Sequence, residues 1–165
     1  MITEPKMETR GEQHYAVIRQ HVSIPFGSLL GPLWGEVSAW LTSNGATSAG
    51  PPIIRYLTTD MDKGLDIEVG FPIASAISGA DRVSAVVLPA GRYAVTVHTG
   101  PYDDLVTATA ELLAWAEKNG IVWQTSMIDS IEWWTGRIES YPTDPNKEPD
   151  PQKWQTELAF LIAEE

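Results

Sequence analysis

The chain repeats itself, because short segments of its first half return in the same order in its second half. Such a repeat is informative about architecture, since both copies are expected to adopt the same supersecondary structure. The separation between matching segments changes only where loops are expected, as duplication followed by insertion predicts. The matching pairs are Tyr15–Ile18 with Tyr93–Thr96, Ile24–Phe26 with Gly100–Tyr102, Ala39–Trp40 with Ala114–Trp115, Asn44–Gly45 with Asn119–Gly120, and Glu68–Ala74 with Glu157–Ala163.

Each copy begins with a strand that leads into a helix. Alternating apolar residues predict strands from Tyr15 to Val22 and from Val83 to Thr99, the second with a bend near Pro89-Ala90-Gly91. Asp103 and Asp104 suit the exposed N–H groups at the start of the second helix. Gly45 and Gly120 end the two helices. The apolar stripes, in which both tryptophans are expected to be core residues, are Leu30, Leu33, Val37, Trp40 and Leu41, and Leu105, Ala108, Leu112, Trp115 and Ala116.

Two further strands close each copy. They are predicted at Ile53–Thr58 and Leu65–Ala74, and at Ile131–Tyr141 and Trp154–Ala163. Prolines between Pro142 and Lys153 predict a loop, because proline lacks the N–H that a strand ladder needs. The predicted fold is α+β, with tandem duplicated β-α-β-β units, antiparallel sheets, two long helices and a central pocket. One domain is expected over residues 1–165, with repeats at about 13–76 and 81–164.

Charge and composition argue against several classes of protein. The chain has 11 basic and 22 acidic residues, a formal net charge of −11, and no run of Lys or Arg, so direct nucleic-acid binding is not expected. The acidity either keeps the surface soluble or concentrates cationic ligands. Cys is absent and the three His are far apart, so neither a disulfide, a metal site nor a cofactor is predicted. No signal peptide or membrane-spanning run is recognisable, and a cytoplasmic protein is expected.

Seven tryptophans are many for a chain of 165 residues. Trp123, Trp133 and Trp134 lie in or beside an insertion that the first copy lacks, so the duplicated fold does not require them. They either line one side of a cavity or cover an exposed sheet edge, and both interpretations remain open.

The segment from Arg137 to Tyr141 is a candidate site. Strand alternation places Arg137, Glu139 and Tyr141 on one face, and the repeat places Tyr56 on the same face of the first copy. A buried carboxylate there would attract a cation or hold a raised pKa. The alternative is a solvated ion pair between Arg137 and Glu139.

Two more carboxylates enter the same hypothesis. Glu157 lies on the final strand, and Glu68 occupies its place in the first copy. If the final strand lies beside that of Glu139, the two strands are expected to bring Glu139 and Glu157 onto one concave surface.

The turn before the second helix carries a family resemblance. Its residues His98-Thr99-Gly100-Pro101-Tyr102-Asp103-Asp104-Leu105 resemble the H-x-G-P-Y-x-x-L turn of the gyrase-inhibitor-like (GyrI-like) small-molecule-binding domains. The segment from Tyr141 to Leu161, with Pro142, Pro145, Pro149, Pro151 and Trp154, is similar to the C-terminal end of that family. The resemblance covers nearly the whole chain.

The resemblance implies a GyrI-like effector-binding domain, with a pocket between its halves, related to the ligand-sensing parts of multidrug-sensing transcription regulators. In these regulators a pocket Glu on the penultimate strand and aromatic side chains receive lipophilic cations. By position Glu139 matches that Glu and Glu157 a second acidic residue, while Tyr141, Tyr56 and Trp133 correspond to the aromatic wall. Ala159 is small where relatives can carry Tyr, which implies a wider or differently shaped pocket. No DNA-binding segment precedes residue 15, so the chain resembles the stand-alone members.

Three functions are compatible with the resemblance. The first is uptake of bulky aromatic or lipophilic cationic compounds, with contacts from Glu139, Glu157, Tyr141, Tyr56, Trp133, Trp123, Tyr102 and Glu68. The second is a hydrolase that opens the cyclopropane of DNA-alkylating natural products. In that case Glu139 or Glu157 activates water, and Trp133, Tyr141 or Tyr102 orients the electrophile. The third is an inhibitor of a partner enzyme, acting through the acidic surface. His98 precedes a turn, which favours a hydrogen-bonded structural role over a catalytic one.

Overall fold

The computed structural model describes residues 1–60 and 62–164, and it confirms the α+β class. Eight strands form one antiparallel sheet, and β7 and β8 form a separate hairpin. The elements in chain order are β1 (Lys6–Arg10), β2 (Gln13–Val22), α1 (Gly27–Ser43), β3 (Ile53–Tyr56), β4 (Leu65–Ile73), β5 (Val83–Leu88), β6 (Gly91–Thr99), η1 (Tyr102–Asp104), α2 (Leu105–Lys118), β7 (Thr125–Ile128), β8 (Ile131–Trp134), β9 (Arg137–Ser140), η2 (Pro151–Lys153) and β10 (Gln155–Leu161).

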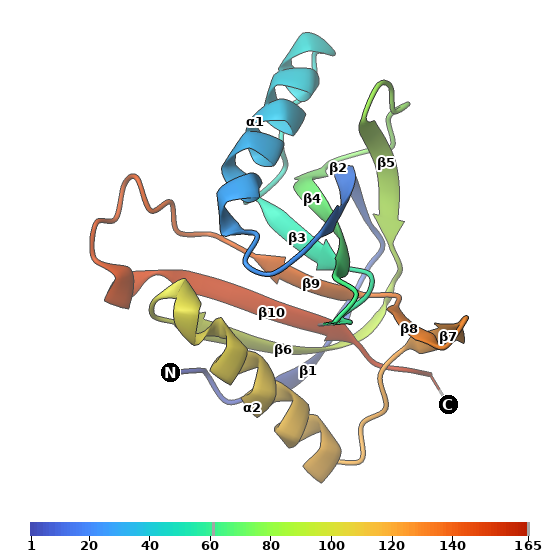
Figure 1. Ribbon diagram of the computed structural model, residues 1–165, viewed down its shortest axis with the longest axis vertical. Coiled ribbons are helices and arrows are strands. Elements are labelled where there is room, and N and C mark those ends of the chain that lie inside the picture. The colour runs from blue at the N-terminus through green and yellow to red at the C-terminus, as the bar shows by residue number, and fades with distance from the viewer. Residues whose placement is uncertain (61, 165) are drawn as a thin grey trace.

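The two copies of the repeat meet at the centre of the sheet. The strand order is β1-β6-β10-β9-β3-β4-β2-β5, so the copies are β2-α1-β3-β4 and β6-α2-β9-β10, joined by the pairing of β3 with β9. In that pair Ile54 lies opposite Glu139. These two residues also occupy equivalent positions in the two copies, so the pseudo-two-fold axis that relates the copies passes between them. In Figure 1 β2 and β4 of the first copy run steeply, whereas β6, β9 and β10 of the second copy lie closer to the horizontal.

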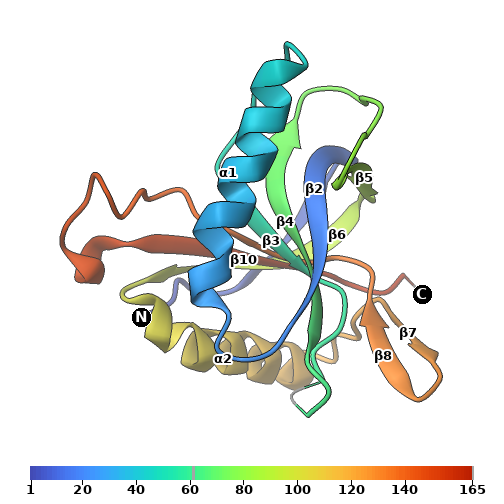
Figure 2. The same cartoon turned by 45° about the horizontal axis from the view of Figure 1, so that its top comes forward.

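Both helices cover the same face of the sheet, here called the helical face. Helix α1 packs on β2 and β4, and α2 packs on β6; Figure 2 shows the two helices from another side, running in different directions. The helices bury Leu33, Val37 and Leu41 from α1 and Ala108, Leu112 and Ala116 from α2. The opposite face, the back face, has its own apolar cluster, which includes Tyr15, Val17, Tyr93, Val95 and Ile138.

Two predicted strands are divided in the structure. The segment from Val83 to Thr99 bends where expected, but it forms two strands. Strand β5 pairs with β2 and β6 pairs with β10, toward opposite ends of the strand order. The segment from Ile131 to Tyr141 is interrupted at Thr135-Gly136, so β8 turns away to pair with β7 while β9 enters the sheet. Strand β1, which pairs with β6, was not predicted from the polar start of the chain.

The predicted helix ends are confirmed by backbone geometry. Gly45 and Gly120 have φ angles of 69° and 67°, the left-handed conformation that glycine adopts without strain. Trp40 and Trp115 are half-buried and pack at the edges of the two helical-face clusters. They therefore belong to the margin of the core.

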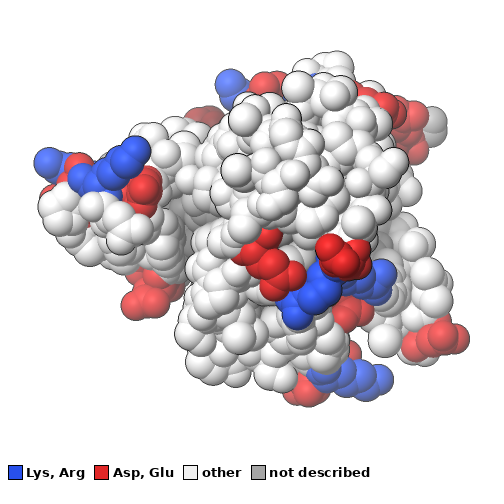
Figure 3. All heavy atoms as spheres, turned by 90° about the horizontal axis from the view of Figure 1, so that it is seen from above, with Lys and Arg blue, Asp and Glu red and all other residues white. Residues whose placement is uncertain are grey.

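The surface drawn in Figure 3 has no broad basic patch, because acidic and basic residues alternate in small groups between large uncharged areas. Within the described residues, no helix is both long and apolar enough to cross a membrane.

Candidate ligand-binding cavity

A cavity of about 920 Å³ lies on the helical face between the two copies. Both helices, the central strands β3 and β9 and the loop after β9 contribute to its wall. Most lining side chains are apolar or aromatic, as in sites for drug-sized ligands. They include Ile24, Pro25, Phe26, Leu30, Trp34, Pro52, Ile54, Tyr56, Leu65, Phe71, Tyr102, Leu105, Val106, Arg137, Glu139, Tyr141, Pro142 and Pro145.

Equivalent positions of the two copies line the two sides of the cavity. Tyr56 and Tyr141 are equivalent, as are Leu30 and Leu105. The equivalence fails at the charged positions, because Glu139 replaces Ile54 and Arg137 replaces Pro52. The repeat therefore builds a symmetric apolar frame, and of the two central strands only β9, in the second copy, supplies charged residues to the cavity lining.

Glu139 is the buried carboxylate of the cavity, with 6% of its surface exposed. Tyr141 donates a hydrogen bond from its hydroxyl to Glu139 Oε2 at 3.4 Å. Burial raises the pKa of Glu139, while hydrogen bonding by Tyr56 and Tyr141 and the positive charge of Arg137 oppose that rise. Burial and the neighbouring Glu139 carboxylate raise the pKa of both phenols well above 10.0, so both remain neutral donors.

A chain of aromatic rings continues from the Glu139 site. Trp34 and Tyr102 each contact Tyr141 edge to face, with ring centroids 5.4 and 5.8 Å away. Trp154 lies 4.7 Å from Tyr102. The indole N–H of Trp34 donates to the carbonyl of Ile53 at 3.1 Å, which fixes the ring in place. These rings present flat apolar surfaces for an aromatic ligand.

The expectation that Glu139 and Glu157 share a surface is wrong. Strand β10 pairs Leu158 with Glu139, so Leu158 shares the face of Glu139, and Glu157 points to the back face. There Glu157 forms an ion pair with Arg10, at 3.1 Å. Glu68 is also on the back face, where it pairs with Arg55 at 3.0 Å. The register of β10 against β9 decides this result, because it places Leu158 and not Glu157 opposite Glu139.

Trp133 and Trp123 also lie away from the cavity lining. Trp123 packs on Trp134 and Phe160, with centroids 5.9 and 5.6 Å away, beside the end of β10. Trp133 is in the β7–β8 hairpin, where the guanidinium of Arg19 lies 5.4 Å from its ring. Neither tryptophan lines the cavity, so the structure does not support the cavity-wall interpretation; Trp123 instead packs in an aromatic cluster beside β10, an inner strand of the sheet.

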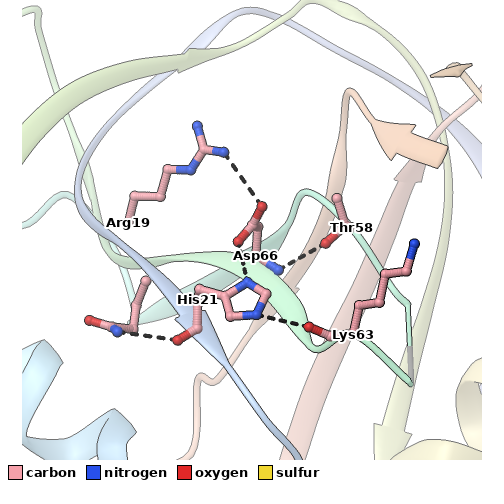
Figure 4. A network of polar contacts seen from close by, with 6 residues as sticks. Arg19, His21, Thr58, Lys63 and Asp66 are labelled. Atoms are coloured by element: carbon pink, nitrogen blue, oxygen red, sulfur yellow. Dashed lines mark hydrogen bonds and ion pairs between the residues drawn. The ribbon is translucent and has the colours of Figure 1, made fainter. Parts of the chain in front are cut away.

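Arg19 belongs to a polar network outside the cavity, shown in Figure 4. The carboxylate of Asp66 forms an ion pair with Arg19 at 3.6 Å and lies 2.7 Å from His21 Nδ1. The backbone N–H of Asp66 donates a hydrogen bond to the Thr58 hydroxyl. His21 Nε2 contacts the carbonyl of Lys63 at 2.9 Å. The network joins the end of β2 to the start of β4 and to the turn before it, which is a structural role.

Sequence reasoning missed Trp34, Phe26 and Phe71 as cavity residues. A signal for Trp34 existed, because it occupies the position of Thr109 in the repeat and so is a difference between the copies, like Glu139. His98 is buried, and its Nε2 contacts the carbonyl of Pro101 at 3.2 Å, in agreement with a structural role. Among the described residues, no three His, Asp or Glu side chains gather as they would around a metal ion.

A large, mostly apolar cavity with a buried carboxylate, formed between two copies of one unit, is typical of small-molecule-binding domains. The chain belongs to the family of the GyrI-like small molecule binding domain, whose model matches residues 3–163. A comparison with curated protein sequences found no match.

Solved structures with the same fold include a protein in complex with DNA, a hydrolase and a protein bound to tetraphenylphosphonium. EcmrR in its DNA complex is 22% identical with a TM-score of 0.78; the alignment covers 98% of this chain and 58% of the EcmrR chain. A hydrolase from Listeria innocua is 16% identical with a TM-score of 0.65, over 97% and 92% of the two chains. SAV2435, solved bound to tetraphenylphosphonium, is 11% identical with a TM-score of 0.60, over 98% and 94%. The chain thus spans a little over half of the EcmrR chain in that complex.

Proposed function

We propose that the cavity binds bulky aromatic and lipophilic cationic compounds, with Glu139 beside the positive charge. One observation carries the proposal: a buried carboxylate lies at the centre of a large apolar cavity framed by Tyr56 and Tyr141. A cation that loses its water on entry regains favourable interactions from the carboxylate and from the electron-rich faces of the rings. The tetraphenylphosphonium complex of SAV2435, which shares the fold, supports this class of ligand.

The site favours aromatic cations over compact ones. Its hydrogen-bonding groups are few, whereas Trp34, Tyr102 and Leu105 provide apolar surface around Glu139. A small hydrated ammonium ion would lose more hydration than these groups replace. Because the fold is also that of EcmrR, a protein solved in complex with DNA, we extend the proposal to a role as the ligand-sensing part of a regulatory system.

The test is a calorimetric titration of the protein with tetraphenylphosphonium. We expect one molecule to bind per chain, because the cavity lies on the pseudo-two-fold axis. The substitution Glu139→Gln should weaken binding about tenfold or more, corresponding to ~1.4 kcal/mol for the lost charge interaction. Glu157→Gln is the matched control, because Glu157 is on the same sheet but faces the other way. Equal affinity of the Glu139→Gln variant and the wild type would remove Glu139 from this role.

Hydrolysis is the second candidate function, and the raised pKa of Glu139 favours it. A carboxyl group with a raised pKa is suited to general acid–base work near neutral pH, and the neutral phenols of Tyr56 and Tyr141 are donors for a developing negative charge. Mass analysis after incubation with a cyclopropane-bearing aromatic compound tests this function. Addition of water by the wild type and its loss in Glu139→Gln would favour the enzyme, whereas recovery of the unchanged compound would exclude this reaction.

A further inference from the structure

Arg137 is the second charged group of the cavity, and nothing proposed so far uses it. It lines the cavity together with Glu139, from the same face of β9. Its guanidinium lies 4.6 Å from the ring of Trp134, 4.7 Å from Phe160 and 5.8 Å from Tyr56. The side chain is therefore held by three aromatic rings, which stabilise its charge and restrict its position.

The side chain of Arg137 makes no hydrogen bond or ion pair with any described residue, and its buried Nε has no partner. The contact with Glu139 is longer than an ion pair, although the two charges are close enough for each to influence the pKa of the other. Stacking uses the faces of a guanidinium, whereas hydrogen bonding uses the N–H groups at its edge. The rings around Arg137 therefore leave its donors unused.

The arginines of the back face differ from Arg137. The buried Nε of Arg55 also has no partner, but the two terminal nitrogens of Arg55 donate to Glu68 at 3.0 Å and to the carbonyl of Thr135 at 2.6 Å. Arg10 pairs with Glu157 at 3.1 Å. Leaving a buried donor without an acceptor costs roughly 1–3 kcal/mol. A bound molecule that carries the missing acceptor would recover this cost.

We propose that Arg137 is a specificity-determining residue that receives an anionic or strongly hydrogen-bond-accepting group of the ligand while Glu139 receives its cationic or donor group. The preferred ligands are thus amphoteric aromatic compounds, such as zwitterions. The inference rests on the proposed function of the cavity and narrows its ligand class. A carboxylate matches the fork of a guanidinium in two hydrogen bonds, which a simple lipophilic cation does not provide. A ligand with only a positive charge would meet repulsion from Arg137.

A matched pair of dyes tests the proposal. A rhodamine ethyl ester is a lipophilic cation, and the same dye as its free acid is a zwitterion at neutral pH. We expect the wild type to bind the free acid about tenfold more tightly, the effect of one charge-assisted interaction. Arg137→Met should abolish or reverse this preference, mainly by weakening the binding of the acid. Arg137→Lys should keep part of it, because the charge remains and the fork is lost.

Arg19→Met is the control, because Arg19 also contacts a tryptophan ring but lies outside the cavity lining. Its ratio of the two affinities should equal that of the wild type. Thermal unfolding of each variant checks that it is folded. Binding of both dyes without preference for the acid would overturn the role of Arg137 and leave the binding function standing. An equal loss of both dyes in Arg137→Met would also overturn it. If neither dye binds to the wild type, the function proposed for the cavity fails, and this inference fails with it.

Discussion

At the scale of the residue, one position of the repeat accounts for much of the chemistry. Glu139 and Ile54 are equivalent residues that face each other across the pseudo-two-fold axis. An apolar residue at both positions would complete a symmetric core. The carboxylate at one of them instead places a charge in an apolar space, which is costly for stability unless it serves a ligand. Charge at Glu139 therefore indicates a site.

This cost predicts a pH dependence of stability. The pKa of Glu139 is raised in the folded chain above its ordinary value of 4.5. Between 4.5 and the folded pKa, the folded form binds more protons than the unfolded form, so the contribution of Glu139 to stability falls as pH rises through that window. In Glu139→Gln this fall should be absent, and the variant should gain in free energy of unfolding relative to the wild type as pH rises. Urea unfolding at several pH values measures it; parallel curves would contradict the raised pKa.

At the scale of the element, close strand pairing depends on small residues at particular positions. Gly70 on β4 pairs with Val17 on β2. A Cβ atom at Gly70 would overlap the carbonyl oxygen of Ala16 and come within 2.8 Å of Val17 Cα. Both contacts are with backbone, which does not move aside as the end of a long side chain would. The glycine thus permits the close approach of two central strands of the first copy.

We predict that Gly70→Ala lowers the free energy of unfolding by about 3 kcal/mol, because the clash displaces backbone. The matched control is Gly35→Ala on α1, where a new Cβ would have no neighbour within 4 Å. That change should raise stability by up to about 1 kcal/mol, because alanine favours the helix. Chemical denaturation of both variants provides the comparison. If the two substitutions had the same effect, the close approach at Gly70 would not be the cause.

The elements also show how far local sequence patterns reach. The helices and their glycine ends follow from apolar spacing and turn chemistry, and these predictions agree with the structure. The division at Pro89-Ala90 was predicted as a bend within one strand and not as a strand end, and the division at Thr135-Gly136 was not predicted. Whether a strand ends at such a position depends on which other strand each flanking segment pairs with. Pairing is a long-range property that alternation does not contain.

At the scale of the whole molecule, the duplication explains why the cavity is central. The copies join through β3 and β9, and each contributes a helix to the same face, so a space remains between α1 and α2 over the axis. The side walls repeat, as Tyr56 and Tyr141 do. The two sides of the cavity differ only where equivalent positions carry unlike residues, such as Pro52 and Arg137. A ligand with two different ends matches such a site better than a symmetric one.

The sequence by itself determined the duplicated β-α-β-β units, the family, and the positions of Glu139, Tyr141 and Tyr56 on one face of the sheet. These follow from periodicity, from a repeat, and from motif residues close in the chain. Only the tertiary structure decided that Glu157 and Glu68 face away, that Trp123 and Trp133 lie outside the cavity lining, and that Trp34 joins the cavity. The reason is physical: strand register and helix docking are set by contacts between distant segments, and a shift of one residue would have exchanged the two faces of the sheet.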